Sequence, residues 1–135
     1  MTKNKYMGLT YGDPAGIGPE ILQKTLLNWN FKFNPLVIGY KKYLRKNVKE
    51  IKNVIFCQPK ELLFKECNFN IGIPSKFTGL HSYICLREAV KLIKKREIFS
   101  LVTGPVSKKA INLAKINFQG QTDAIAKFCK IDPKN

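Results

Sequence analysis

Short apolar runs alternate along this chain with longer segments whose apolar positions recur at helical spacing. The runs are typical of buried strands, and they cover residues 5–11, 35–40, 53–57 and 98–103. The segments that follow them predict helices at residues 19–29, 41–49, 59–66, 80–96, 106–114 and 123–130. Because strands and helices alternate over the whole chain, the pattern predicts an α/β fold with a largely parallel sheet.

Two of the predicted helices have a clear apolar face. The helix over 19–29 starts at Pro19 and Glu20, which suit the positive end of a helix. Its face consists of Ile21, Leu22, Thr25, Leu26 and Trp29. The helix over 80–96 is the longest, and it has an apolar stripe formed by Tyr83, Ile84, Leu86, Val90 and Ile93. We assign Ser75 and Gly79 to the loop before it.

Length and composition limit the class of protein. The chain has 135 residues, 44% of them hydrophobic, which suits one compact domain and argues against disorder. No run reaches the roughly 18 to 20 apolar residues of a membrane-spanning helix, so we expect no membrane-spanning role and no membrane partner. The first residues are polar and basic, and the apolar segment after them is interrupted by glycine and proline. We therefore expect no signal peptide and a cytoplasmic location.

The formal net charge is +15 at pH 7, and 21 of the 24 basic residues are lysines. Nucleic-acid readers favour arginine, which contacts bases and phosphates with two parallel hydrogen bonds. The chain also has no arginine cluster and no RNP-like motif, and we find no interleaved aromatic residues in it. We interpret the charge as a solvated lysine surface and expect no nucleic-acid partner.

The potential metal ligands do not form a recognisable site. The four cysteines, Cys57, Cys67, Cys85 and Cys129, include no C-x-x-C pair, and the one histidine is His81. We expect the cysteines to be reduced and partly buried. We expect His81 to be partly exposed near the start of the long helix and not a ligand, because a metal site needs three or four donors that converge.

Two loops follow apolar strands and lead into helices, which is where parallel α/β sheets bind ligands. The first covers residues 12–20, where Gly16 and Gly18 allow close backbone approach to an anion or cofactor. It is neither a G-x-G-x-x-G nor a Walker A motif, so a purely structural turn is equally compatible with it. Asp13 is either a polar contact to a ligand or a turn-stabilising residue.

The second loop covers residues 103–108. Thr103, Ser107 and Lys108 offer two hydroxyls and a cation, a suitable set for a phosphate or carboxylate beside Gly104. The alternative is an N-capped helix with a surface lysine. Because both loops follow apolar strands, we expect them to lie close together at the carboxyl ends of neighbouring strands. A third turn, at residues 119–122, precedes the last helix.

These motifs together resemble the 4-hydroxythreonine-4-phosphate dehydrogenase family of pyridoxal phosphate biosynthesis. The resemblance rests on residues 12–20, 103–108 and 111–114, on Ser75, Gly79 and Ser82, and on the turn at residues 120–123. It implies a fold similar to one part of the isocitrate and isopropylmalate dehydrogenases, with α/β/α layers and a homodimer that completes the site. It also implies NAD-dependent oxidation and decarboxylation of a phosphorylated hydroxy amino acid, with a divalent metal.

The chain departs from the family pattern at the last turn. The family turn is Gly-His-Thr-Glu, with a His and a Thr that contact substrate, and here these positions are Gln121 and Thr122, followed by Asp123. The family's metal-binding histidines follow this turn and have no counterpart here, and family members are well over twice as long. We therefore expect an amino-terminal portion, with residues 1–135 as a single partial domain that is inactive alone. The alternatives are a phosphate-ligand-binding module that depends on a complementary carboxyl-terminal chain, and a remnant of a paralogous dehydrogenase.

Overall fold

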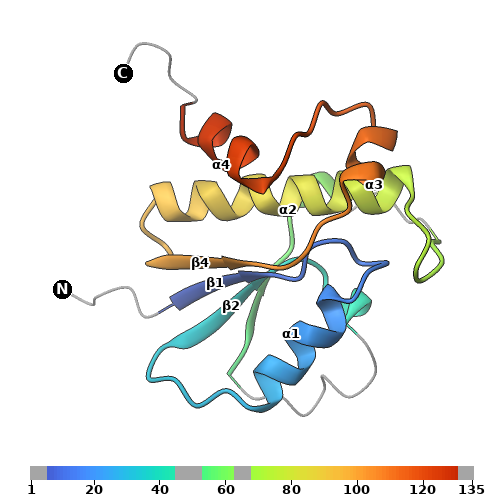
Figure 1. Cartoon of the computed structure of the whole chain (residues 1–135). Coiled ribbons are helices and arrows are strands. Elements are labelled where there is room, and N and C mark those ends of the chain that lie inside the picture. The colour runs from blue at the N-terminus through green and yellow to red at the C-terminus, as the bar shows by residue number, and fades with distance from the viewer. Residues whose placement is uncertain (1–5, 45–52, 63–67, 131–135) are drawn as a thin grey trace.

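The computed structural model describes residues 6–44, 53–62 and 68–130, and it contains one sheet of four parallel strands (Figure 1). The strands are β1 (Tyr6–Thr10), β2 (Asn34–Ile38), β3 (Ile55–Cys57) and β4 (Ser100–Thr103). Their order across the sheet is β3-β2-β1-β4. The helices are α1 (Gly18–Leu27), α2 (Lys76–Lys94), α3 (Lys108–Leu113) and α4 (Gln121–Cys129). The predicted α/β class with a parallel sheet is confirmed.

The helices cover the sheet on both faces and so form three layers (Figure 1). On one face α1 packs over a core of six buried residues: Leu9, Tyr11, Leu22, Leu26, Val37 and Leu44. On the other face α2 contributes Ile84, Cys85, Ala89 and Leu92 to a cluster that includes Ile38 and Ile98. The outer side of α2 carries α3 and α4 through a third cluster: Leu86, Val90, Ile111, Phe118, Ala124 and Phe128.

The predicted face of α1 is only half correct. Leu22 and Leu26 are buried against the sheet, whereas Ile21 and Thr25 are exposed. The helix contacts the sheet along a narrow stripe of residues four apart, and Thr25 satisfies its hydroxyl by donating to the Ile21 carbonyl. Trp29 lies beyond the helix and is half-buried.

The long helix α2 begins four residues earlier than the sequence predicts. Ser75 is its N-cap, since its hydroxyl accepts from the Thr78 amide at 3.1 Å while the Ser75 amide donates to the Thr78 hydroxyl at 3.2 Å. This reciprocal capping box satisfies free amides of the first turn. The assignment of Gly79 to a loop is therefore wrong. Gly79 lies inside the helix, and a glycine is needed there because any side chain would overlap the backbone of Ala110 in α3.

Other predicted elements have different bounds in the structure. Of the helix predicted over residues 41–49, the structure has a 3-10 turn at Lys41–Tyr43, and residues 45–49 lie outside the described part. Of the helix predicted over 59–66, it has a 3-10 turn at Lys60–Leu62, and residues 63–66 are likewise outside. Helix α3 starts at Lys108 and not at Val106, and α4 starts at Gln121, inside the predicted turn. Among the described residues no helix is long and apolar enough to cross a membrane.

Candidate functional site

The loops that follow β1 and β4 lie against each other at the carboxyl ends of these neighbouring strands. The Asp13 amide donates to the Pro105 carbonyl at 3.0 Å, and the Gly104 amide donates to the Thr10 carbonyl at 2.7 Å. The expectation that the two loops are adjacent is confirmed. Their contact is made by backbone atoms, so its position is set by the backbone path more than by any side chain.

Glycines make this approach possible. Gly12 has a φ of 75°, and a side chain there would overlap the Pro105 carbonyl. A side chain at Gly18 would overlap the Tyr11 carbonyl, and one at Gly104 would crowd the backbone of Tyr11. A Cβ at Gly16 would instead meet nothing closer than 3.4 Å. Gly12, Gly18 and Gly104 thus allow two backbone segments to pack directly against each other, whereas Gly16 lines a pocket.

A pocket of about 250 Å³ lies between these two loops. Its lining is mostly apolar, with Ile17, Ile73, Pro74, Pro105 and Val106 around the backbone of Gly16. The residues at 72–74 were not expected from the sequence. They reach the pocket because the Gly72 amide donates to the Ala15 carbonyl at 2.7 Å, a contact between distant segments that has no signature in local sequence.

Asp13 is the one ionisable residue among the described residues that line this pocket, and it is buried. One carboxylate oxygen, Oδ1, accepts from the Ala15 amide at 2.7 Å, which stabilises the turn. The other, Oδ2, is buried with no hydrogen-bond partner in the described structure. Burial raises the pKa of Asp13, and this effect is opposed by the Ala15 amide and the nearby Thr78 hydroxyl. The turn-stabilising interpretation of Asp13 is therefore supported.

The polar residues of the second loop, at residues 103–108, do not line a single site. Ser107 lines the pocket, and its hydroxyl oxygen caps α3 by accepting from the Ala110 amide at 3.1 Å. Thr103 is half-buried at the end of β4. Lys108 is exposed and lies in a separate open hollow with Lys109, Asn112 and Leu113. The sequence treated Ser107 and Lys108 as one set, but the start of α3 places them in different hollows.

Gln121 connects the last helix to this site. Its Nε2 donates to the Gly104 carbonyl at 3.1 Å, while its Oε1 is buried and has no hydrogen-bond partner among the described residues. Thr122, the next residue, is exposed on α4. Residues 103–108 and 121 thus come together, although the sequence alone did not place the turn at residues 119–122 beside the two loops.

The comparison with family models matches residues 19–134 to the pyridoxal phosphate biosynthetic protein PdxA. The chain belongs to the PdxA family. It is 29% identical to a 4-hydroxythreonine-4-phosphate dehydrogenase of Aquifex aeolicus, over 92% of this chain and 42% of the relative. It is 28% identical to a D-threonate 4-phosphate dehydrogenase of Pectobacterium atrosepticum, over 93% of this chain and 44% of the relative.

The chain is also similar to solved structures of 4-hydroxythreonine-4-phosphate dehydrogenases. The crystal structure of 4-hydroxythreonine-4-phosphate dehydrogenase from Klebsiella pneumoniae matches with a TM-score of 0.75 and 26% identity, over 93% of this chain and 44% of that one. The chain therefore spans less than half the length of the PdxA relatives it matches. The resemblance to this family and the fold that it implies are confirmed.

His81 is fully buried, so the expectation that it is partly exposed is wrong. Its Nε2 lies 3.2 Å from the Tyr11 hydroxyl, and its Nδ1 lies 3.8 Å from Cys85 Sγ. The Tyr11 hydroxyl also accepts from the Tyr40 amide at 2.8 Å. Desolvation, with a smaller effect of Lys42, lowers the pKa of His81 to about 3, so the ring is neutral near pH 7.

The described residues do not fit the divalent metal that the PdxA resemblance implies. Nowhere in residues 6–44, 53–62 and 68–130 do three or more His, Cys, Asp or Glu side chains converge. Of the cysteines, Cys85 is buried, Cys57 is half-buried and Cys129 is exposed, while Cys67 lies outside the described residues. Burial raises the pKa of Cys57 and of Cys85, which keeps both as neutral thiols.

Buried His81 predicts a specific loss of stability in acid. Its folded-state pKa lies below the ordinary value of 6.5, so the unfolded chain takes up the proton first as the pH falls. His81→Gln keeps a hydrogen-bonding group beside Tyr11 and cannot titrate. We expect the free energy of unfolding of the wild-type chain to fall by about 2 kcal/mol more than that of the variant between pH 7 and pH 5. Urea unfolding at both pH values measures this, and parallel losses in the two proteins would contradict a buried neutral histidine.

Proposed function

We propose that the chain supplies one lobe of an NAD-dependent 4-hydroxythreonine-4-phosphate dehydrogenase, which oxidises and decarboxylates its substrate in pyridoxine 5'-phosphate biosynthesis. Membership of the PdxA family and the names of the relatives support this activity. The observation that carries the proposal is the pocket between the loops at residues 12–20 and 103–108. These loops hold the sequence motifs on which the resemblance to the family rests. We place the enzyme in the cytoplasm, with no nucleic-acid partner in this reaction.

The pocket suits part of a cofactor better than a phosphate. Its volume of about 250 Å³ falls below the roughly 300–1,000 Å³ of sites that enclose a whole ligand, so it fits one ring of a larger molecule. Ile17, Ile73 and Val106 provide apolar contacts for a flat ring. The described residues that line the pocket include no cation to hold a phosphate, and the one ionisable group among them is the acid Asp13. We assign the pocket to the nicotinamide end of NAD, which when bound accepts the hydride from the substrate.

The hollow beside α3 suits the phosphate of the substrate. Lys108 and Lys109 place two cations there, and Asn112 adds an amide. Ser107, between the hollow and the pocket, keeps a hydroxyl proton to donate because its oxygen accepts from the Ala110 amide. Thr103, at the end of β4, lies on the same loop. A ligand that bridges the two hollows would present its phosphate to Lys108 and its carbon skeleton toward the pocket.

Gln121 and Thr122 correspond to the substrate-contacting pair of the family turn. An amide at position 121 hydrogen-bonds but does not exchange protons near neutral pH, so Gln121 orients and does not act as an acid or base. Since the described residues do not fit a metal, we derive no step through one. We infer that the reaction needs groups from outside these residues, through a homodimer or a complementary carboxyl-terminal chain.

A second candidate is a related phosphorylated substrate, or retained ligand binding without catalysis. The relatives include D-threonate 4-phosphate dehydrogenases at a similar identity, 27 to 28%, so family membership does not choose between the two substrates. Gln121 in place of the family histidine favours binding without turnover. Both alternatives keep the phosphate at Lys108 and differ in the fate of the ligand.

We expect the 135-residue chain alone to produce no NADH from NAD and 4-hydroxythreonine-4-phosphate in the presence of Mg²⁺. The reason is that the Lewis-acid contribution of a held metal, worth several kcal/mol, has no ligands among the described residues. Absorbance of NADH in a steady-state assay measures this, with the full-length Aquifex aeolicus relative as positive control. NADH formation that a chelator abolishes would show that this chain is sufficient for activity.

Phosphate binding tests the assignment of the hollow. Lys108→Ala is expected to weaken binding of inorganic phosphate by about 1.5 kcal/mol, a little over tenfold, as for a hydrogen bond to a charged group. Lys127→Ala, which removes an exposed lysine on α4, serves as the matched control and should leave the affinity unchanged. Titration calorimetry measures both. Equal affinities in the two variants would mean that Lys108 is a solvated surface residue.

A further inference from the structure

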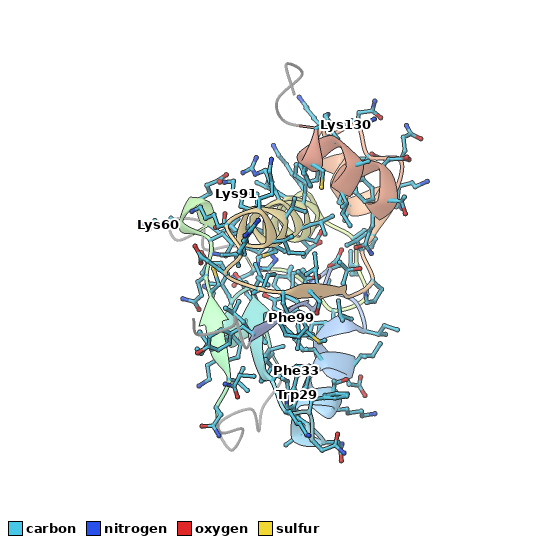
Figure 2. All side chains as sticks on the ribbon, turned by 90° about the vertical axis from the view of Figure 1, so that its left-hand side faces the viewer. Trp29, Phe33, Lys60, Lys91, Phe99 and Lys130 are labelled. Carbon is cyan, nitrogen blue, oxygen red and sulfur yellow. The ribbon has the colours of Figure 1, made fainter. Side chains whose placement is uncertain are left out.

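Four aromatic side chains from two distant segments form a continuous cluster, which we call the aromatic ladder: Trp29, Phe31, Phe33 and Phe99. Phe31 and Phe33 are nearly parallel, with ring centroids 5.3 Å apart. Trp29 meets Phe31 edge-on at 5.0 Å, and Phe99 meets Phe33 edge-on at 5.1 Å. Figure 2 shows Phe99, Phe33 and Trp29 one below the other on the side of the molecule that faces the viewer.

The ladder lies at the opposite end of the sheet from the candidate site. Phe33 directly precedes β2 and Phe99 directly precedes β4, so both mark the amino ends of strands. The pocket lies where β1 and β4 end, at their carboxyl side. The proposed dehydrogenase function therefore makes no use of the ladder.

The ladder is exposed and yet held in place. Phe31 is 56% exposed and Phe99 is 49% exposed, although both are large apolar side chains. Trp29 Nε1 donates to the Phe33 carbonyl at 2.9 Å, which closes the loop between α1 and β2. The Phe99 amide donates to the Tyr6 carbonyl at 3.1 Å. Because the rings are already ordered, a partner that covers them would lose little conformational entropy in doing so.

Basic residues flank the ladder residues in the sequence. Lys32 stands between Phe31 and Phe33, and Lys94, Lys95 and Arg96 precede Phe99 at the end of α2, with Glu97 as the one acid in that stretch. The segment from residue 28 to residue 34 contains no acidic residue. With a net charge of +15 on each chain, a second copy would be repelled, whereas an anionic surface would be attracted.

We propose that the aromatic ladder docks the protein on the surface of an anionic lipid bilayer. The exposed rings would enter the boundary between headgroups and acyl chains, where Trp and Phe side chains are buried favourably, while the lysines meet lipid phosphates. This association lies on the surface and does not span the membrane.

Two features favour a bilayer over a nucleic acid. Lysines act as point charges and suit diffuse attraction to headgroups, whereas base and phosphate recognition favours arginine. The rings of the ladder also pack against one another. Ring faces that nucleic-acid bases would need for stacking are therefore already covered. Trp29, Phe31 and Phe33 alternate with polar residues, so the expectation of no interleaved aromatic residues is wrong. The test therefore includes an oligonucleotide.

Trp29 provides the measurement, because it is the single tryptophan of the chain and belongs to the ladder itself. Its fluorescence is recorded as the full chain is titrated with vesicles of equal parts phosphatidylglycerol and phosphatidylcholine, or of phosphatidylcholine alone. We expect a blue shift and co-sedimentation with the anionic vesicles, both reduced by salt, and neither with the neutral ones.

Matched variants separate insertion of the rings from charge attraction. Phe31→Ser combined with Phe99→Ser is expected to weaken vesicle binding at least about tenfold, since burial of even one such ring contributes that much. Ile71→Ser, which removes a more exposed apolar side chain outside the ladder, should bind like the wild type. Lys32→Glu leaves every ring in place and should also weaken binding, which keeps the test decisive if the double variant is poorly folded.

Four results would overturn the proposal. They are the absence of binding to anionic vesicles, binding that is equal in the wild type and the ladder variants, a blue shift caused by protein concentration alone, and an equal shift with a single-stranded oligonucleotide. The third result would identify the ladder as a contact between copies, and the fourth as a nucleic-acid surface. All four leave the dehydrogenase proposal untouched, because its assays report on Lys108 and on NADH.

Discussion

The backbone contact between the loops after β1 and β4 fixes the arrangement of the candidate site. The Asp13 amide on Pro105 and the Gly104 amide on Thr10 join segments that lie about ninety residues apart in sequence. Such an approach tolerates no side chain at Gly12, Gly18 or Gly104. These glycines thus have a structural role that does not depend on any ligand, because they let two strand ends converge closely beside the pocket.

The same contact is anchored in the core through Tyr11, the residue before Gly12. Its hydroxyl meets the Tyr40 amide on one side and His81 on the other, so the loop, the end of β2 and helix α2 are tied by one buried polar network. Each member has a partner there, as buried polar groups require. Asp13 adds a buried carboxylate whose Oδ2 lacks a partner, a local cost typical of functional sites. The buried polar network of Tyr11 and the buried carboxylate of Asp13 thus belong to the same turn.

Sequence reasoning predicted the strands and the adjacency of the two loops, because apolar runs identify buried strands and parallel strands end at the same edge. It failed at a local helix cap and at several contacts between distant segments. His81 is buried because Tyr11 and Cys85 surround it, and α2 starts early because Ser75 and Thr78 cap each other. Ile73 reaches the pocket through the Gly72–Ala15 hydrogen bond, and Lys108 turns away from Ser107 at the first turn of α3. The cap formed by Ser75 and Thr78 is a local pattern that was missed, whereas the contacts of Tyr11 with His81 and of Gly72 with Ala15 join segments that no local pattern connects.

Amide hydrogen exchange of Asp13 in the isolated chain tests the central contact most directly. If the loops are locked as the structure has them, the Asp13 and Gly104 amides exchange about as slowly as the amide of Leu9 in the central strand β1, since all three open only when the strand ends separate. Exchange of Asp13 and Gly104 at the rate of unprotected amides, with Leu9 still protected, would show that the loops are not joined. The pocket between the two loops would then not be permanently formed in the folded chain.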